Sequence, residues 1–494
     1  MTDEGKEPAV STSTIYGYPR IGPRRELKAA TEAYWAGRAS AEELEATGRT
    51  LRRDAWNFLR DAGLGEVPSN HFSFYDHVLD TIALVGAVPE RFAAGRGGEL
   101  DRLFAMARGS ADAQPLEMTK WFDTNYHYLV PELGPGTRFR LHPAKPLAEL
   151  AEAAELGLAT RPVLLGPVTF LLLGKPAPGS PAGFDRLSLL DPLLEVYAEL
   201  LAALRAAGAD WVQLDEPAFV LDRGGVPEAR EAGVLPEARE ASAELDALGR
   251  AYERLGRLQQ RPKLLVASYF DHLGDALGVL AGTPVDGLAL DFTRGGGRNL
   301  ELLAAAGGLG DRRLVAGVVD GRNVWVNDLE RSLGLLATLL GLAGEVVVAP
   351  SCSLQHVPLD VKAETGLNPA LRPWLAFARQ KVAEVVTLAR GLAQGREAVE
   401  LELDANQRVL AERRASGLVV DPAVRERLAR TDEHHARRAS PHSVRHKAQR
   451  ARLDLPPLPT TTIGSFPQTP ELRKVRAAAR RGALDQAAYQ ARME

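Results

Sequence analysis

Two pairs of side chains in this sequence are of types that carry out acid–base or nucleophilic chemistry. Asp215 and Glu216 are adjacent carboxylates at the end of an apolar run. Neighbours on an extended chain point in opposite directions, so at most one of the two can reach a shared site. Cys352 precedes His356 by four residues, a spacing that permits a cysteine–histidine nucleophile. An isolated pair of this kind is weak evidence, and a buried structural cysteine is the favoured alternative.

A group of basic residues stands where the sequence predicts the start of a helix. Arg24, Arg25 and Lys28 follow the turn-forming pair Gly22-Pro23. A helix N-terminus already carries partial positive charge and normally prefers acidic residues. Two interpretations remain open, namely solvated bases beside Glu26, or an anion clamp that combines backbone N–H groups with basic side chains.

Histidines and a lysine lie among aromatic residues further along the chain. His71 and His77 could bind a metal, but no third ligand stands at a useful spacing, so we expect packing and hydrogen-bonding roles. Lys120 lies among aromatic and amide side chains in residues 117–128, a composition that suits the wall of a pocket.

The elements that must position these residues alternate between short apolar runs and long helical patterns. The runs are continuously apolar, as expected for strands of a parallel sheet covered on both faces. This many strand–helix units favour an α/β fold of the (βα)8 TIM-barrel type over an open sheet. The predicted strands cover residues 14–18, 162–170, 211–217, 263–269, 287–292, 313–321 and 345–350. The predicted helices cover residues 24–46, 52–62, 101–107, 185–207, 237–258, 299–305, 328–341 and 373–392.

Polar residues follow the predicted strands, where the active sites of (βα)8 barrels gather. Taken singly, each of them could instead be a strand cap. They are Asp215-Glu216, Ser268-Tyr269, Asp291, Asp320–Asn323 and Ser351–Ser353.

Composition sets limits on the class of protein. The chain has 494 residues and a formal net charge of -4, which gives no reason to expect nucleic acid or an anionic membrane as a partner. One cysteine excludes an intramolecular disulfide and a multi-thiolate metal site within this chain. Residues 1–13 lack the apolar core of a signal peptide, and no apolar run approaches the ~20 residues of a membrane span. We therefore expect a cytoplasmic protein.

The end of the chain resembles its beginning. Glu26-Leu27 precedes Gly37 by the same interval that separates Glu471-Leu472 from Gly482. A Gly- and Pro-rich segment precedes each Glu-Leu pair. These similarities favour a duplicated unit. We expect a disordered leader (1–13), a first barrel (14–372), a helical connector with a Pro-rich joint (373–458), and the truncated start of a second barrel (459–494). Acidic residues interrupt the basic stretch 425–452, so a connector is favoured over a nucleic-acid patch. The tandem repeat within 227–241 predicts a surface insertion.

The chain resembles the cobalamin-independent methionine synthase family over nearly its whole length. The resemblance implies two (βα)8 barrels, of which the first is a degenerate duplicate of the second. It also implies methyl transfer from 5-methyltetrahydropteroyltri-L-glutamate to L-homocysteine, giving L-methionine, with zinc and without cobalamin. The matching stretches are residues 17–28, 117–122, 125–128, 165–169, 184–190, 213–218, 320–325, 351–353 and 460–469.

The resemblance also implies the site residues. It assigns the folate triglutamate tail to Arg25, Glu26, Leu27, Lys28 and Lys120, and the homocysteine or methionine substrate to Ile463, Gly464 and Ser465. The family's zinc ligands are a His, two Cys and a Glu in the second barrel, so we expect neither a metal site nor a catalytic residue in this chain.

The resemblance leads to one expectation about activity and one about oligomeric state. This chain alone should not methylate homocysteine, and the full-length enzyme should be a monomer. The alternative is a non-catalytic barrel module that binds polyglutamylated folate or a partner catalytic barrel.

Overall fold

A computed structural model describes residues 12–93, 98–110, 112–220, 238–462, 464 and 468–493. The chain divides into two compact units, one up to Ser416 and one from Gly417 onward. Most of the predicted leader and most of the tandem insertion lie outside the described residues.

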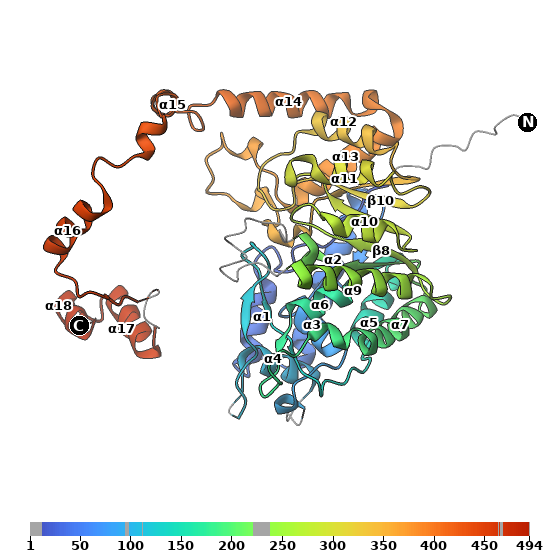
Figure 1. Cartoon of the computed structure of the whole chain (residues 1–494), viewed down its shortest axis with the longest axis horizontal. Helices are drawn as coiled ribbons and strands as arrows, with labels where there is room; N and C mark the ends of the chain where they lie inside the picture. Colours follow the sequence, from blue (N-terminus) through green and yellow to red (C-terminus); the bar gives the residue numbers. More distant parts are fainter. Residues whose placement is uncertain are drawn as a thin grey trace, which may run out of the picture. The chain divides into compact units, whose positions relative to one another are not determined.

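The first unit is built on a seven-stranded sheet in which every neighbouring pair is parallel. Figure 1 shows helices arranged around these strands. Their buried, continuously apolar sequences explain why both faces are covered. In spatial order the strands are β1 (Val67–Ser69), β5 (Thr160–Leu165), β7 (Trp211–Asp215), β8 (Lys263–Ala267), β9 (Gly287–Asp291), β10 (Arg313–Val319) and β11 (Glu345–Pro350).

The segment 12–14 closes this sheet into a ring. The backbone N–H of Thr14 donates to Val348 O at 2.9 Å, and that of Val348 donates to Thr12 O at 2.9 Å. On its other side the segment accepts a hydrogen bond at Ser13 O from the N–H of Glu66, at 2.8 Å. Because the segment pairs in parallel with both neighbours, it takes the place of the eighth strand. The predicted (βα)8 barrel is therefore confirmed.

Helices with one apolar stripe cover the ring. In α2 a capping box at Ser40 starts the helix, and Leu44, Trp56 and Leu59 bury the face turned to the strands. The helices of the first unit are α1 (Glu26–Trp35), α2 (Ala41–Asp61), α3 (His77–Leu84), α4 (Glu99–Arg108), α5 (Ala144–Glu155), α6 (Pro167–Leu173), α7 (Leu190–Ala206), α9 (Ala238–Gly256), α10 (Asp275–Ala281), α11 (Arg298–Ala305), α12 (Leu329–Leu339), α13 (Ala378–Gln394) and α14 (Glu400–Ala415).

Three sequence predictions require correction. The predicted helix 24–46 is two helices, because Gly37 takes a positive φ of 66° after α1 and Ser40 caps a new start. The predicted strand 162–170 ends at Leu165, because Gly166 and Pro167 begin α6. Strand β1 was not predicted, since three residues are too few to show a pattern.

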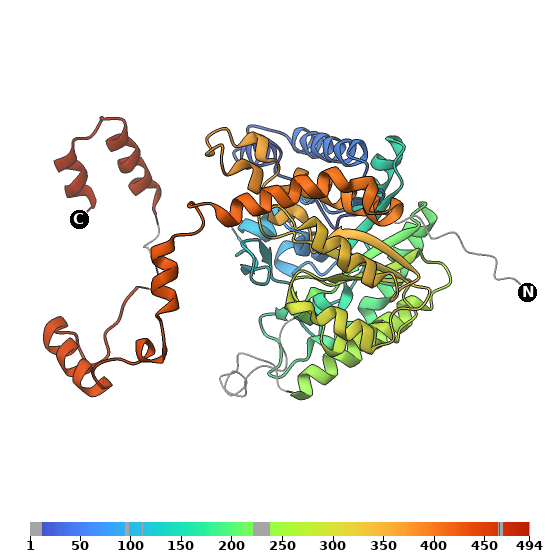
Figure 2. The same ribbon diagram turned by 90° about the horizontal axis from the view of Figure 1, so that it is seen from above.

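The first unit extends beyond the expected barrel boundary at residue 372. Val382, Val385 and Leu388 on one face of α13 are buried, and Asn406 of α14 donates to Asn327 O at 2.8 Å. In Figures 1 and 2 the orange helix α14 lies along the barrel unit. These helices therefore belong to the compact first unit.

The second unit contains α15 (Pro422–Ala429), α16 (His442–Leu453), α17 (Pro470–Arg480) and α18 (Gln486–Met493). Helix α17 ends as α1 does. Gly37 and Gly482 both take a positive φ, of 66° and 69°, and donate to the carbonyl three residues back. In both cases the following N–H reaches the carbonyl five residues back, at 2.9 Å, which completes a Schellman motif. The same motif also ends α2, α3, α5, α7 and α11, so the duplication stays a prediction.

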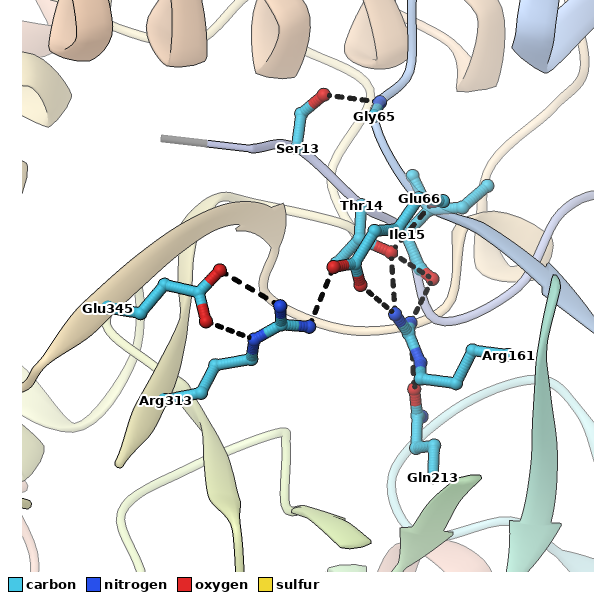
Figure 3. Close-up of polar contacts among 9 residues, drawn as sticks. All are labelled: Ser13, Thr14, Ile15, Gly65, Glu66, Arg161, Gln213, Arg313 and Glu345. Atoms are coloured by element: carbon cyan, nitrogen blue, oxygen red, sulfur yellow. Dashed lines mark hydrogen bonds and ion pairs between the residues drawn. The ribbon is translucent and has the colours of Figure 1, made fainter. Parts of the chain in front are cut away.

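A buried ion-pair network ties the starts of the strands together (Figure 3). Glu66 accepts from Arg161 at 3.0 Å and from Arg313 at 2.6 Å, and Arg313 also forms a bidentate pair with Glu345 at 2.8 and 2.9 Å. The two arginine side chains are only 3% and 9% exposed. At this depth a charge without a partner would be costly, so the network depends on Glu66.

The same network holds the closing segment in place. Arg161 donates to Thr14 Oγ1 and to Ile15 O, each at 3.0 Å, and to Gln213 Oε1 at 3.1 Å (Figure 3). The guanidinium of Arg161 therefore connects the closing segment with β5 and β7.

Candidate functional site

Asp215, at the carboxyl end of β7, points into the barrel. Its carboxylate accepts from Gln213 Nε2 at 2.6 Å and from Tyr269 Oη at 3.0 Å. Burial raises the pKa of Asp215 to about 7, although both hydrogen bonds act to lower it.

Glu216 points the other way, into the helix layer, as the alternation of an extended chain predicts. It accepts from the backbone N–H groups of Val168 and Thr169 at 3.1 and 2.6 Å, and from Tyr252 Oη at 2.8 Å. The carboxylate therefore caps the N-terminus of α6. The two adjacent carboxyls do not form an acid–base pair.

Replacing Asp215 with asparagine is expected to remove a pH dependence of stability. The folded-state pKa of about 7 lies above that of an unfolded aspartate, so the folded protein retains a proton that the unfolded chain releases. This stabilisation is complete below about pH 4 and is lost as the pH rises through about 7. Between pH 5 and pH 8 the free energy of unfolding of the wild type should fall, relative to the variant, by on the order of 2–3 kcal/mol.

Urea unfolding at both pH values measures this difference. Asp210→Asn, at a side chain that is 84% exposed, is the matched control and should show no such trend. A wild-type-to-variant difference that stays constant with pH would contradict the assigned role of Asp215.

Three other strand-end residues are caps. Asp291 accepts from the backbone N–H of Thr293 at 2.7 Å, and Asp320 accepts from the N–H groups of the residues two and three positions on, at 2.8 and 3.0 Å. Ser351 Oγ accepts from Gly321 N at 3.1 Å. These hydrogen bonds shape the loops that follow the strands.

Cys352 and His356 do not form a nucleophilic pair. Cys352 is fully buried, and burial raises the pKa of its thiol far above the usual range. Its sulfur lies 3.7 Å from Ser353 O. The His356 ring packs edge-on against Tyr126 and Phe270, and burial lowers its pKa to about 4. The structure supports the alternative of a buried structural cysteine.

Of the two histidines near the mouth of the barrel, His77 packs against aromatic rings as expected. The His77 ring lies 4.4 Å from that of Trp121 and 5.5 Å from that of Tyr126, and burial lowers the pKa of both His71 and His77 to about 3. Among the residues that the structure describes, no group of three or more His, Cys, Asp or Glu side chains is placed to hold a metal.

The predicted tail-binding residues at α1 have different surroundings. Arg25 is exposed at the N-cap with φ 65°, and Lys28 is exposed beside Glu32, at 3.8 Å. Leu27 is buried and anchors the helix, so it could contact a ligand only through its backbone. The carboxylate of Glu26 turns back to accept from the backbone N–H and the guanidinium of Arg24, at 2.9 and 3.0 Å. An acidic side chain thus already occupies the start of this helix.

Lys120 ends the first strand of a hairpin formed by β2 (Met118–Lys120) and β3 (His127–Leu129). Its side chain is exposed, and within the described ranges no carboxylate lies within ion-pair distance of it. Its ammonium group is therefore available to an external anion.

Arg20 connects the two predicted tail-binding segments. It donates to Ser73 O at 2.7 Å, and its guanidinium lies 5.5 Å from the centre of the Tyr126 ring. The loop that enters α1 therefore contacts the hairpin that carries Lys120. The sequence did not indicate this role for Arg20, because a lone arginine in a Gly- and Pro-rich turn carries no pattern.

The predicted homocysteine-binding residues lie in the second unit. Gly464 is described and exposed, whereas Ile463 and Ser465 lie outside the described residues. Their role stays a prediction.

The closed ring of parallel strands with polar strand ends defines a (βα)8-barrel protein. Residues 12–344 match the family model described as the N-terminal domain of cobalamin-independent synthase, and residues 458–494 match the model of its catalytic domain. The chain belongs to the cobalamin-independent methionine synthase family.

Relatives named 5-methyltetrahydropteroyltriglutamate–homocysteine methyltransferase match nearly the whole chain. The protein from Streptomyces avermitilis is 61% identical over 486 residues, which are 98% of this chain and 61% of the relative. Those from Streptomyces coelicolor and Mycobacterium tuberculosis are 59% and 51% identical, again over 98% of this chain. The chain thus spans about three fifths of the length of these relatives, 60–61%.

Solved structures support the fold. A B12-independent methionine synthase from Shewanella, in complex with selenomethionine, aligns with a TM-score of 0.51 and 17% identity, and covers 80% of this chain and 100% of its own. A putative vitamin-B12-independent methionine synthase from Listeria monocytogenes aligns with a TM-score of 0.50 and 13% identity, over 77% of this chain and 99% of its own. In the described part of the chain, no helix combines the length and apolar character needed to cross a membrane.

Proposed function

We propose that this chain is part of a methionine synthase that transfers the methyl group of 5-methyltetrahydropteroyltri-L-glutamate to L-homocysteine, and that its first barrel binds the triglutamate tail. The observation that carries the proposal is the 61% identity, over 98% of the chain, to a methyltransferase named for these substrates. A single buried cysteine suits the reducing cytoplasm, where we place the protein.

The chain's contribution would be electrostatic. Arg25, Lys28 and Lys120 are exposed cations on two segments that meet through Arg20. The carboxylates of a glutamate chain would form charge-assisted hydrogen bonds with them. Binding energy gained at the tail, far from the reacting atoms, can help to orient the pterin for transfer.

Zinc, which the family resemblance implies, turns a bound thiol into a thiolate nucleophile when present. The residues of this chain do not fit such a site, since its one cysteine is buried and no suitable ligand group exists among the described residues. No step of the proposal passes through the metal here.

Removal of single cations is expected to weaken binding of the tail. The chain should bind the triglutamyl pterin more tightly than the monoglutamyl form in calorimetric titrations. Lys120→Met and Arg25→Met should each weaken triglutamyl binding about three- to ten-fold, with little change for the monoglutamyl form. Lys263→Met, at the start of β8, is the control and should change neither. Equal affinity of the wild type for both pterins would refute the proposed tail site.

A turnover assay tests whether this chain alone can carry out the methyl transfer. Incubated with zinc, homocysteine and the triglutamyl pterin, this chain should produce no methionine, because these 494 residues supply one thiol where the family resemblance requires two. Methionine formation, followed by mass spectrometry, would contradict this expectation.

A further inference from the structure

The tip of the β2–β3 hairpin lies across the carboxyl ends of the barrel strands. Trp121, the residue after Lys120, is fully buried, and its backbone N–H donates to Tyr126 O at 2.8 Å. The Tyr126 ring contacts His77, which follows β1, and His356, which follows β11. Contacts from the loops after the two strands that flank segment 12–14 therefore hold the turn that begins at Lys120.

Asp123, at the tip of the hairpin, contacts two further strand-end loops. Its Oδ1 accepts from Arg322 Nη1 at 2.5 Å and its backbone carbonyl accepts from Arg322 Nη2 at 3.1 Å. Its other carboxylate oxygen lies 3.7 Å from Arg294 Nη1. Arg322 is 14% exposed, so its position is fixed by the barrel and it forms a rigid anchor for the tip.

The backbone of the tip is strained where it meets the barrel. Phe122 has a φ of 51° and Phe270, after β8, has a φ of 88°, and their ring centres lie 5.7 Å apart. Bulky residues rarely adopt this region, and such strain persists only where surrounding contacts impose it. Asp123 directly follows Phe122, so its ion pairs are among the contacts that impose the strained turn.

We propose that Asp123 is a positioning residue for Lys120. By binding Arg322 and Arg294 it locks the hairpin tip onto the barrel and fixes the backbone from which the Lys120 ammonium meets a carboxylate of the ligand. Two residues separate Lys120 from Asp123, so release of the tip frees the end of β2 as well. This inference rests on the proposed function of Lys120 in binding the glutamate tail.

A double-mutant cycle on this chain tests the inference. The measured quantity is the ratio of the dissociation constants of monoglutamyl and triglutamyl 5-methyltetrahydropterin. Asp123→Asn should lower this ratio about three- to ten-fold, Asp123→Glu should restore it, and Asp123→Asn should have no further effect when Lys120 is already methionine. Hydrogen exchange should show faster exchange of the Trp121 amide in Asp123→Asn, because its bond to Tyr126 O opens more often.

The outcomes separate this inference from the proposed function. A wild type that does not discriminate between the two pterins would refute the tail site itself. If the wild type discriminates and Lys120→Met lowers the ratio, an unchanged ratio in Asp123→Asn would refute the positioning role alone. A loss that persists in the Lys120→Met background would also overturn it, since Asp123 would then act on another group. Glu195→Gln, which breaks an exposed pair with Arg254, is the matched control, and Arg322→Gln is the second variant, expected to repeat the effect.

Discussion

Glu66→Gln is expected to lower the free energy of unfolding by about 3 kcal/mol, because it leaves two buried guanidinium groups short of negative charge. Glu66 is the ion-pair partner of Arg161 and one of two carboxylate partners of Arg313. Arg161 is 3% exposed, so water cannot replace the lost carboxylate. Urea unfolding followed by circular dichroism measures the loss.

Glu345→Gln provides the matched control for this network. Arg313 keeps Glu66 in that variant, and Arg161 is not affected. The loss should therefore be clearly smaller than for Glu66→Gln. Equal losses would show that Glu66 is not the centre of the network.

Gly166→Ala is expected to destabilise the protein by about 3 kcal/mol through overpacking. A Cβ atom at Gly166 would lie 2.3 Å from the carboxyl carbon of Glu216. Glu216 cannot move away without losing its bonds to Thr169 and Tyr252, which fix it at the start of α6.

Gly334→Ala in α12 is the control for this substitution. A Cβ atom there would meet no atom within 4 Å, so the change should stabilise the helix by up to about 1 kcal/mol. Thermal unfolding measures the stability of both variants. A Gly166→Ala protein as stable as the wild type would show that Glu216 is not held rigidly.

The barrel could be predicted from the sequence because buried parallel strands are continuous apolar runs. Strands β7 to β11 were found in this way, and their polar ends appeared where the fold predicts them. Strand β1 has three residues, and the closing segment 12–14 is identified only by its pairing with Val348 and Glu66. Such elements are defined by their partners and carry too little pattern of their own.

The candidate site was less accessible to prediction. The opposite directions of Asp215 and Glu216 follow from strand geometry and are confirmed. The pairing of Asp123 with Arg322 joins residues 199 positions apart, and no local spacing encodes it. The tail-binding roles of Arg25 and Lys120 stay predictions, since their exposed side chains show which charges are available but not which ligand they meet.

The pairing of segment 12–14 with β11 determines when the barrel can close during synthesis. Residues 12–14 are translated before every strand of the seven-stranded sheet, yet their hydrogen-bond partner Val348 emerges only after most of the unit has been translated. Until then the nascent chain carries two unpaired strand edges, which are sites of mispairing with other chains. Closure of the barrel therefore waits for β11, and a pause or stop in translation before this strand should expose the nascent chain to aggregation and to chaperones.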